Sequence, residues 1–173
     1  MRKEPYQEPV DRAEFQITED VTLKPLYRYK RAARVLGRED YHFDRLADIA
    51  PYDLALGWGL MADEAKLQNA KIKIRQSNRF YFWRMPPEGI QVFSVAEVSR
   101  GSANTHIIPA NSQIKDYIAE NVQEGNVIYL AGYLVNVLGK QHQGTWRTST
   151  VRSDVGAGAC EILYVTKITH LDA

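Results

Sequence analysis

A cysteine, a histidine and a nearby asparagine are the residues of this chain best suited to nucleophilic catalysis. Cys160 follows the glycine-rich run 156–159, and His106 lies two residues after Asn104. A thiolate nucleophile needs a neighbouring base and oxyanion donors, and the backbone N–H groups of a glycine-rich loop can supply the donors. This set predicts a cysteine-dependent hydrolase or transferase that uses Cys160 and His106. The alternative is that Cys160 begins a buried strand as a small apolar residue and that His106 bonds to backbone in a loop.

A second set combines cations with aromatic rings in one stretch. The alternating sequence KIKIRQ is followed by the turn signal Ser77-Asn78 and then by RFYFWRM, which together predict a β-hairpin. Surfaces that bind single-stranded nucleic acid combine cations with stacking aromatic rings. The candidate nucleic-acid-binding residues are Lys71, Lys73, Arg75 and Arg79. The alternative is a solvated basic face over an aromatic core, and the net charge of +1 argues against nucleic acid as the partner.

Acidic side chains form a third candidate, for a cation site. The stretch from His42 to Asp53 also carries Asp44 and Asp48, but its spacing fits no known calcium loop. The 4 histidines of the chain lack metal-ligand spacing, and a single cysteine excludes a multi-cysteine zinc site. The glycines of 153–159 precede a strand instead of the helix that a phosphate-binding loop requires. We therefore expect no metal and no cofactor, and we expect the carboxylates to cap helices and pair with the basic first strand.

The most conspicuous pattern of the chain lies in Pro51–Glu64, where Trp58 stands between two glycines. The apolar run around it does not alternate as a strand would, which favours a packed loop or a short helix. Function often lies on loops with unusual residue types. We therefore expect Trp58, the loop 102–106 and the loop 147–154 to form one ligand-binding surface. Its candidate residues are Trp58, Ser102, Arg147 and Asp154. The alternative is that the Trp58 indole anchors one end of the sheet.

Length and composition indicate one globular domain. The chain has 173 residues, of which 45% are hydrophobic and 25% charged, and this is enough to bury a core. We expect a flexible polar lead-in over 1–20 and a single domain over 21–173. The sequence contains no apolar run of the about 18–20 residues that a membrane span needs, and its basic start lacks the apolar stretch of a secretory signal. Two compartments are therefore open: the cytoplasm, or the cell envelope if an N-terminal anchor or signal was removed.

The order of expected elements is a strand, a loop and helix region, three strands, a helix and three strands. Their ranges are 21–36, 39–64, 71–76, 79–85, 90–98, 113–122, 127–138, 146–151 and 161–171, with a further short strand at 105–109. This order predicts a mainly β α+β domain. We expect a curled antiparallel sheet or a small OB-like barrel, with one capping helix and a loop and helix insertion after the first strand.

Five segments are distinctive when they are taken in order: DYHFDR, PYDLALGWGLMAD, SNRFYFWR, SANTHIIPA and GAGACE. Over residues 25–170 they resemble a bacterial family of uncharacterised proteins that shares DLALGWG, SANxHxIPA and GACE-like motifs. The resemblance implies bacterial origin and assigns no activity, cofactor or partner. It also favours an envelope-facing protein, because relatives often carry an apolar N-terminal segment that this chain lacks.

A non-catalytic binding or accessory domain is the function that we expect from the sequence. Its sets of acid, base and nucleophile are incomplete, whereas several loops combine aromatic residues with glycine. The expected partner is a protein or a small molecule. Catalysis by Cys160 and His106, and nucleic-acid binding by the hairpin, are the two alternatives.

Overall fold

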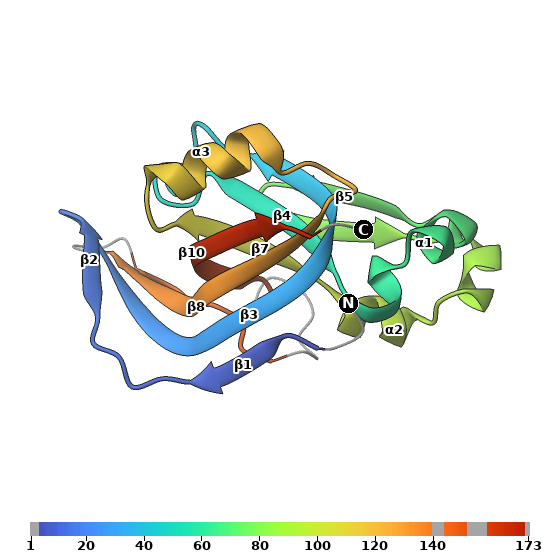
Figure 1. Cartoon of the computed structure of the whole chain (residues 1–173), viewed down its shortest axis with the longest axis horizontal. Helices are drawn as coiled ribbons and strands as arrows, with labels where there is room; N and C mark the ends of the chain where they lie inside the picture. The colour runs from blue at the N-terminus through green and yellow to red at the C-terminus, as the bar shows by residue number, and fades with distance from the viewer. Residues whose placement is uncertain (1–3, 140–143, 152–158, 172–173) are drawn as a thin grey trace.

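A mixed eight-stranded sheet forms most of the fold, which is α+β and mainly β (Figure 1). The computed structural model describes residues 4–139, 144–151 and 159–171. The strands of the sheet are β1 (Tyr6–Pro9), β2 (Phe15–Thr18), β3 (Val21–Asp40), β4 (Tyr52–Gly57), β7 (Ser102–Pro109), β8 (Val127–Gly139), β9 (Thr145–Trp146) and β10 (Glu161–His170). A separate hairpin consists of β5 (Lys73–Ser77) and β6 (Phe80–Arg84). The helices are α1 (Glu64–Ala70), α2 (Val95–Gly101) and α3 (Ser112–Asn121), with short 3-10 helices η1 (Gly59–Ala62) and η2 (Pro87–Gln91).

The long strand β3 curls the sheet into a partial ring. It pairs with β8 from Val21 to Arg34 and with β4 from Arg34 to Asp40, so its partner changes along its length. The ring continues from β4 to β7, from β7 to β10 and from β10 back to β8. β7 and β10 run parallel, whereas the other pairs in the ring are antiparallel.

Two parts of the expected fold class are corrected by these pairings. The sheet is mixed instead of antiparallel, because β7 and β10 are neighbours that run in the same direction. It is also not a barrel, because further strands extend the sheet outside the ring. β1 and β2 pair with the part of β3 that does not pair with β4, and β9 pairs with β8. β1 and β2 belong to the segment that we expected to be a flexible lead-in, and most of their side chains are exposed.

Strand β4 corrects our interpretation of Pro51–Glu64 as a loop or short helix. All residues of Tyr52–Gly57 are buried, because β4 is central in the sheet and is covered on both faces. A strand that is buried on both faces reads as a continuous apolar run without alternation. Only after Trp58 does the chain turn helical, through η1 and α1.

Helices account for the other corrections, since the described residues form three α-helices where we expected one capping helix and a loop and helix region over 39–64. The stretch 90–98 is not a strand: Ser94 caps α2 with a complete capping box that includes Glu97. The expected helix near 113–122 is confirmed as α3, which Asn111 caps by accepting a hydrogen bond from the Ile114 N–H.

The remaining strands follow the sequence pattern closely. The hairpin, β8 and β10 are confirmed with nearly the expected bounds, whereas β9 covers only the first residues of the expected strand 146–151. The Asn78-Arg79 turn of the hairpin has positive φ at both residues, as a two-residue hairpin turn requires.

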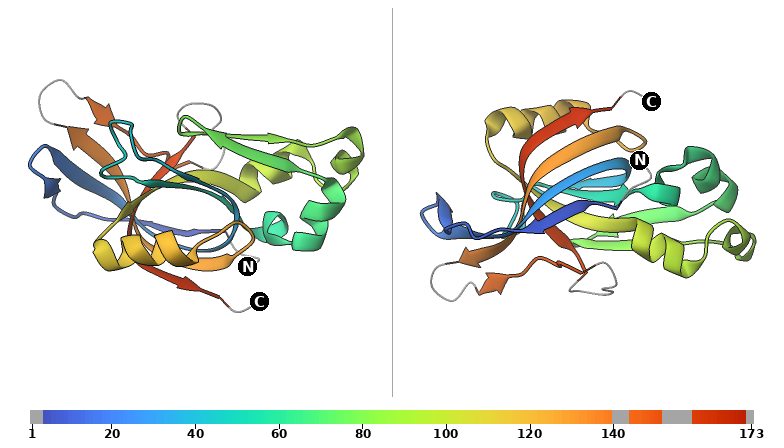
Figure 2. Two further views of the ribbon diagram at one scale, coloured as in Figure 1. Left: turned by 90° about the horizontal axis from the view of Figure 1, so that it is seen from above. Right: turned by 60° about the horizontal axis from the view of Figure 1, so that its bottom comes forward.

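The core has two main parts and a third under the hairpin. Strands of the ring and α3 form the first cluster, which includes Tyr29, Leu54 and Leu163. The third cluster joins α2, η1 and the hairpin around Phe93 and Met61, and these elements form a lobe beside the sheet (Figure 2). In the described part of the chain, the helices are too short to cross a membrane.

Candidate functional site

A polar cluster lies on one face of β4, β7 and β10, under the hairpin. Asp53 pairs in register with His106, and Glu161 pairs with Thr105, which sets Cys160 opposite Asn104. Because side chains alternate along a strand, Asp53, Asn104, His106 and Cys160 share a face. The sheet therefore brings together the three residues of the predicted catalytic set, together with a carboxylate that was not part of that prediction.

The Asp53 carboxylate binds two cationic or polar partners through one oxygen. Its Oδ1 lies 2.7 Å from the His106 Nδ1 and 3.0 Å from the Arg79 Nη1. Asp53 and His106 are buried, and the imidazole packs against the Trp146 indole with 4.6 Å between ring centroids. A buried carboxylate bonded to a ring nitrogen fixes the orientation of the imidazole.

Arg79 links this cluster, through hydrogen bonds, to the segment that joins β3 to β4. Its guanidinium donates to both oxygens of Asp44, at 2.7 and 2.8 Å, and to the Ala50 carbonyl at 2.7 Å. It also lies over the Tyr41 ring, 3.7 Å from the centroid. These hydrogen bonds from Arg79 lower the pKa of Asp44, while burial raises the pKa of Tyr41 to about 12. We predicted that Arg79 contacts nucleic acid, but its guanidinium is bonded to Asp44, to the Ala50 carbonyl and to Asp53 of the sheet.

Cys160 has partners other than His106 in the part of the chain that the structure describes. The Asn104 Nδ2 donates to its sulfur over 3.8 Å, and the thiol donates to the Arg79 carbonyl over 3.8 Å. Burial raises the pKa of the Cys160 thiol, which works against a thiolate at neutral pH. Cys160 is hydrogen-bonded to Asn104, and His106 is hydrogen-bonded to Asp53. Among the described residues, Cys160 and His106 form no hydrogen bond with each other.

The opposite face of the same strands carries a buried ion pair that sequence reasoning missed. Glu161 accepts hydrogen bonds from Arg31 at 2.9 Å, Tyr29 at 2.9 Å and Thr105 at 3.2 Å. The Arg31 guanidinium also lies over the Trp58 ring, 4.0 Å from the centroid. The signal in the sequence was a glutamate directly before the apolar run 162–165.

The residues of the predicted ligand surface differ in their exposure to solvent. Trp58 is 4% exposed and packs over Arg31, as the anchoring alternative requires. Ser102 is buried in β7, where its hydroxyl lies 2.8 Å from the Tyr81 hydroxyl, so the expected loop 102–106 is part of a strand. Arg147 is exposed, whereas Asp154 and the glycine run up to residue 158 lie outside the described residues.

The outer face of the hairpin presents cations and aromatic rings together. The register pairs Lys73 with Arg84 and Arg75 with Phe82, and the side chains of this face are exposed. Phe80 and Phe82 are 42% and 53% exposed, with 6.4 Å between ring centroids. The inner face, with Tyr81 among its residues, packs into the third core cluster, and burial raises the pKa of Tyr81 to about 12.

No family model, curated protein or solved structure matches this chain. The resemblance that we drew from its motifs therefore stays a prediction, and the site is argued from geometry alone.

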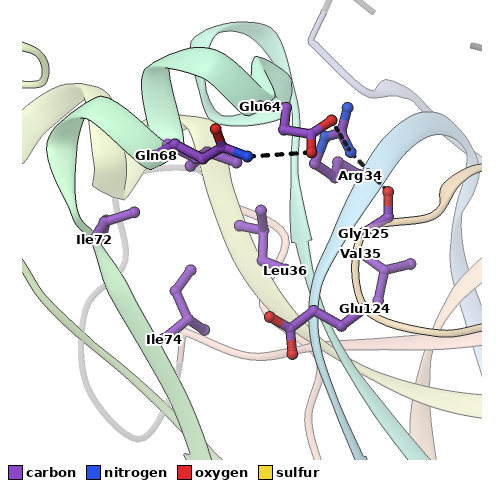
Figure 3. A pocket seen from close by; sticks show the side chains of 10 residues that line it. Arg34, Val35, Leu36, Glu64, Gln68, Ile72, Ile74, Glu124 and Gly125 are labelled. Atoms are coloured by element: carbon purple, nitrogen blue, oxygen red, sulfur yellow. Dashed lines mark hydrogen bonds and ion pairs between the residues drawn. The ribbon is translucent and has the colours of Figure 1, made fainter.

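Three of the concave regions that the described residues form lie beside these elements. A pocket of about 170 Å³ lies between β3, α1 and β5, where Arg34 donates to Gly125 and pairs with Glu64, which accepts from Gln68 (Figure 3). Its polar groups largely satisfy one another, so it has little to offer a ligand. A groove of about 470 Å³ at the open end of the hairpin is lined by Lys71, Lys73, Arg84, Met85, Pro86, Pro87 and Glu88.

The third region is a groove of about 680 Å³ between the connection 41–51 and β9. Leu46, Ile49 and Trp146 form apolar parts of its lining, and Arg45 and Asp48 are polar parts. No group of three or more His, Cys, Asp or Glu side chains is placed to bind a metal ion within the described ranges.

Proposed function

We propose that this chain is a non-catalytic binding domain that binds single-stranded nucleic acid through the outer face of its hairpin. The observation that carries the proposal is the exposure of Phe80 and Phe82 beside Arg75 on one face of a two-stranded ribbon. Aromatic rings of this size are usually turned into the core. Base stacking on exposed aromatic side chains tolerates any sequence, since every base has a π-face.

Local charge supports this ligand although the net charge of the chain is only +1. Every charged residue from Lys71 to Met85 is a cation. The groove at the open end of the hairpin brings Lys73 and Arg84 together, while Glu88 pairs with Lys71 at 3.6 Å. Cations along one groove can follow a phosphate backbone, and the stacking rings lie on the same face.

The way the hairpin is mounted also favours binding. Tyr81 and Trp83 pack into the core beneath it, and Arg79 attaches its turn to Asp44 and Asp53. A surface that is already ordered loses less conformational entropy when it binds.

The partial ring adds a fold-level analogy. We infer that the strand order β3, β4, β7, β10 and β8, with α3 between β7 and β8 in the chain, is OB-like, and OB-folds commonly bind oligonucleotides or oligosaccharides. Fold analogy does not assign function, so it only supports the geometric argument.

Cysteine-dependent catalysis has weaker support. The contact of Asn104 with Cys160 and the Asp53–His106 pair would favour it. The raised pKa of the thiol and the separate partners of Cys160 and His106 oppose it.

Fluorescence anisotropy with a labelled oligothymidine of about 15 nucleotides tests the proposal at about 50 mM salt. Phe82→Ala should raise the Kd about tenfold through the loss of one stacking platform. Arg75→Ala should weaken binding and reduce the slope of log Kobs against log salt by about 0.7, the value for one phosphate contact on a single strand.

Lys115→Ala is the matched control, because Lys115 is an exposed cation on α3. Its Kd should equal that of the wild type. The proposal is wrong if the wild type does not bind at low salt, or if Lys115→Ala weakens binding as much as Arg75→Ala does.

A further inference from the structure

Phe43 is the most exposed of the large apolar side chains that the structure describes at the surface. Its relative exposure is 99%, and it lies in the connection between β3 and β4. Hydrogen bonds within the connection order this segment: Tyr41 N–H donates to the Pro51 carbonyl at 2.8 Å, and Leu46 N–H donates to the Asp44 carboxylate at 2.9 Å. The phenyl ring is thus presented to solvent from a segment that is itself held in place.

Ion pairing brings this segment to the turn of the hairpin. Asp44, next to Phe43 in the chain, binds Arg79, which is next to Phe80. The Arg79 N–H also donates to the Tyr41 hydroxyl at 2.8 Å. The connection 41–51 and the hairpin turn therefore lie side by side (Figure 2, left).

The charges around Phe43 would suit a phosphate. Asp44 is paired with Arg79, which leaves Arg45 as the next charged group of the segment. Arg45 is exposed, lines the groove of about 680 Å³ and has no ion pair among the described residues. Asp20 and Asp48 also line that groove, so a phosphate is favoured at Arg45 and disfavoured beside these two carboxylates.

We propose that Phe43 and Arg45 form a second contact point for the same nucleic-acid strand. The strand runs along Phe82 and Phe80, passes the hairpin turn, stacks a base on Phe43 and places a phosphate against Arg45. This inference rests on the proposed function and extends it, because it makes binding depend on oligonucleotide length.

Two oligothymidines test it, one of about 4 nucleotides and one of about 15. Phe43→Leu keeps an exposed apolar side chain but removes the π-face, so it should raise the Kd of the long oligonucleotide about tenfold. Phe43→Trp should bind the long oligonucleotide at least as well as the wild type. Arg45→Ala should weaken long-strand binding and lower its salt slope by about 0.7. The short oligonucleotide, which the hairpin alone can hold, should bind these variants as it binds the wild type.

The outcomes separate the two proposals. If Phe82→Ala weakens long-strand binding while Phe43→Leu and Arg45→Ala do not, the second contact point is wrong and the hairpin site stands. If Phe43→Leu and Phe43→Trp behave alike, stacking on Phe43 is wrong. If the wild type binds neither oligonucleotide, both proposals fail together.

Discussion

Arg79, in the turn of the hairpin, forms an ion pair with Asp53 near the start of β4, with 3.0 Å between Nη1 and Oδ1. The Asp53 side chain is fully buried, and the same oxygen bonds to His106. One pair thus joins the outer hairpin to the polar cluster of the sheet. The relationship gives Arg79 a structural role that the exposed cation Arg75 does not share.

Removing this cation should destabilise the fold. Arg79→Met leaves the Asp53 carboxylate buried with one partner fewer, and we expect a loss of about 3 kcal/mol in the free energy of unfolding. Urea unfolding measures it. Arg75→Met is the control, since Arg75 is exposed, and should change stability by less than about 0.5 kcal/mol. Equal effects of the two substitutions would show that the buried pair contributes nothing.

Acidification should weaken the attachment of the hairpin turn through Asp44. Hydrogen bonds from Arg79 lower the pKa of this carboxyl in the folded state. A lowered pKa means that the stabilisation is fully present above the unfolded value of about 3.9 and is lost as the pH falls through the folded value. The stability difference between wild type and Asp44→Asn, about 1 kcal/mol near neutrality for this partly exposed group, should shrink below pH about 4. A difference that stays constant from neutral to acid pH would contradict this.

Gly132 is predicted to tolerate no side chain. A Cβ at this position in β8 would lie 1.9 Å from the Tyr164 carbonyl oxygen, which is backbone and cannot rotate away. Gly132→Ala should cost about 3 kcal/mol by thermal or urea unfolding. Gly37→Ala offers a comparison, because its Cβ would meet the end of the Gln76 side chain at 2.8 Å, which can move. A Gly132→Ala protein as stable as Gly37→Ala would overturn the packing argument.

The thiol of Cys160 should react slowly at neutral pH. Burial raises its pKa, and an activated nucleophile would need the opposite shift. Alkylation rates measured against pH should give an apparent pKa above the ordinary value of about 8.5. An apparent pKa near 7, lost in His106→Ala, would instead favour the cysteine-dependent alternative.

Sequence alone determined the elements whose patterns are local. Alternation and a turn signal predicted the hairpin, and the helix expected over 113–122 is α3. It failed at β4, where burial on both faces removes the alternation, and at 90–98, where a capping box outweighs apolar character. The sequence identified Cys160, His106 and Asn104 as candidates, but it did not show which of them are in contact.

Tertiary structure decided what those residues do. The parallel pairing of β7 with β10 places Cys160 beside Asn104. The register of β4 with β7 places His106 opposite Asp53. The hairpin sequence left open which aromatic rings face outward. Packing of Tyr81 and Trp83 into the third cluster turns Phe80 and Phe82 to solvent. Strand register and long-range ion pairs join residues that are far apart in the chain, and no local pattern of residue types records them.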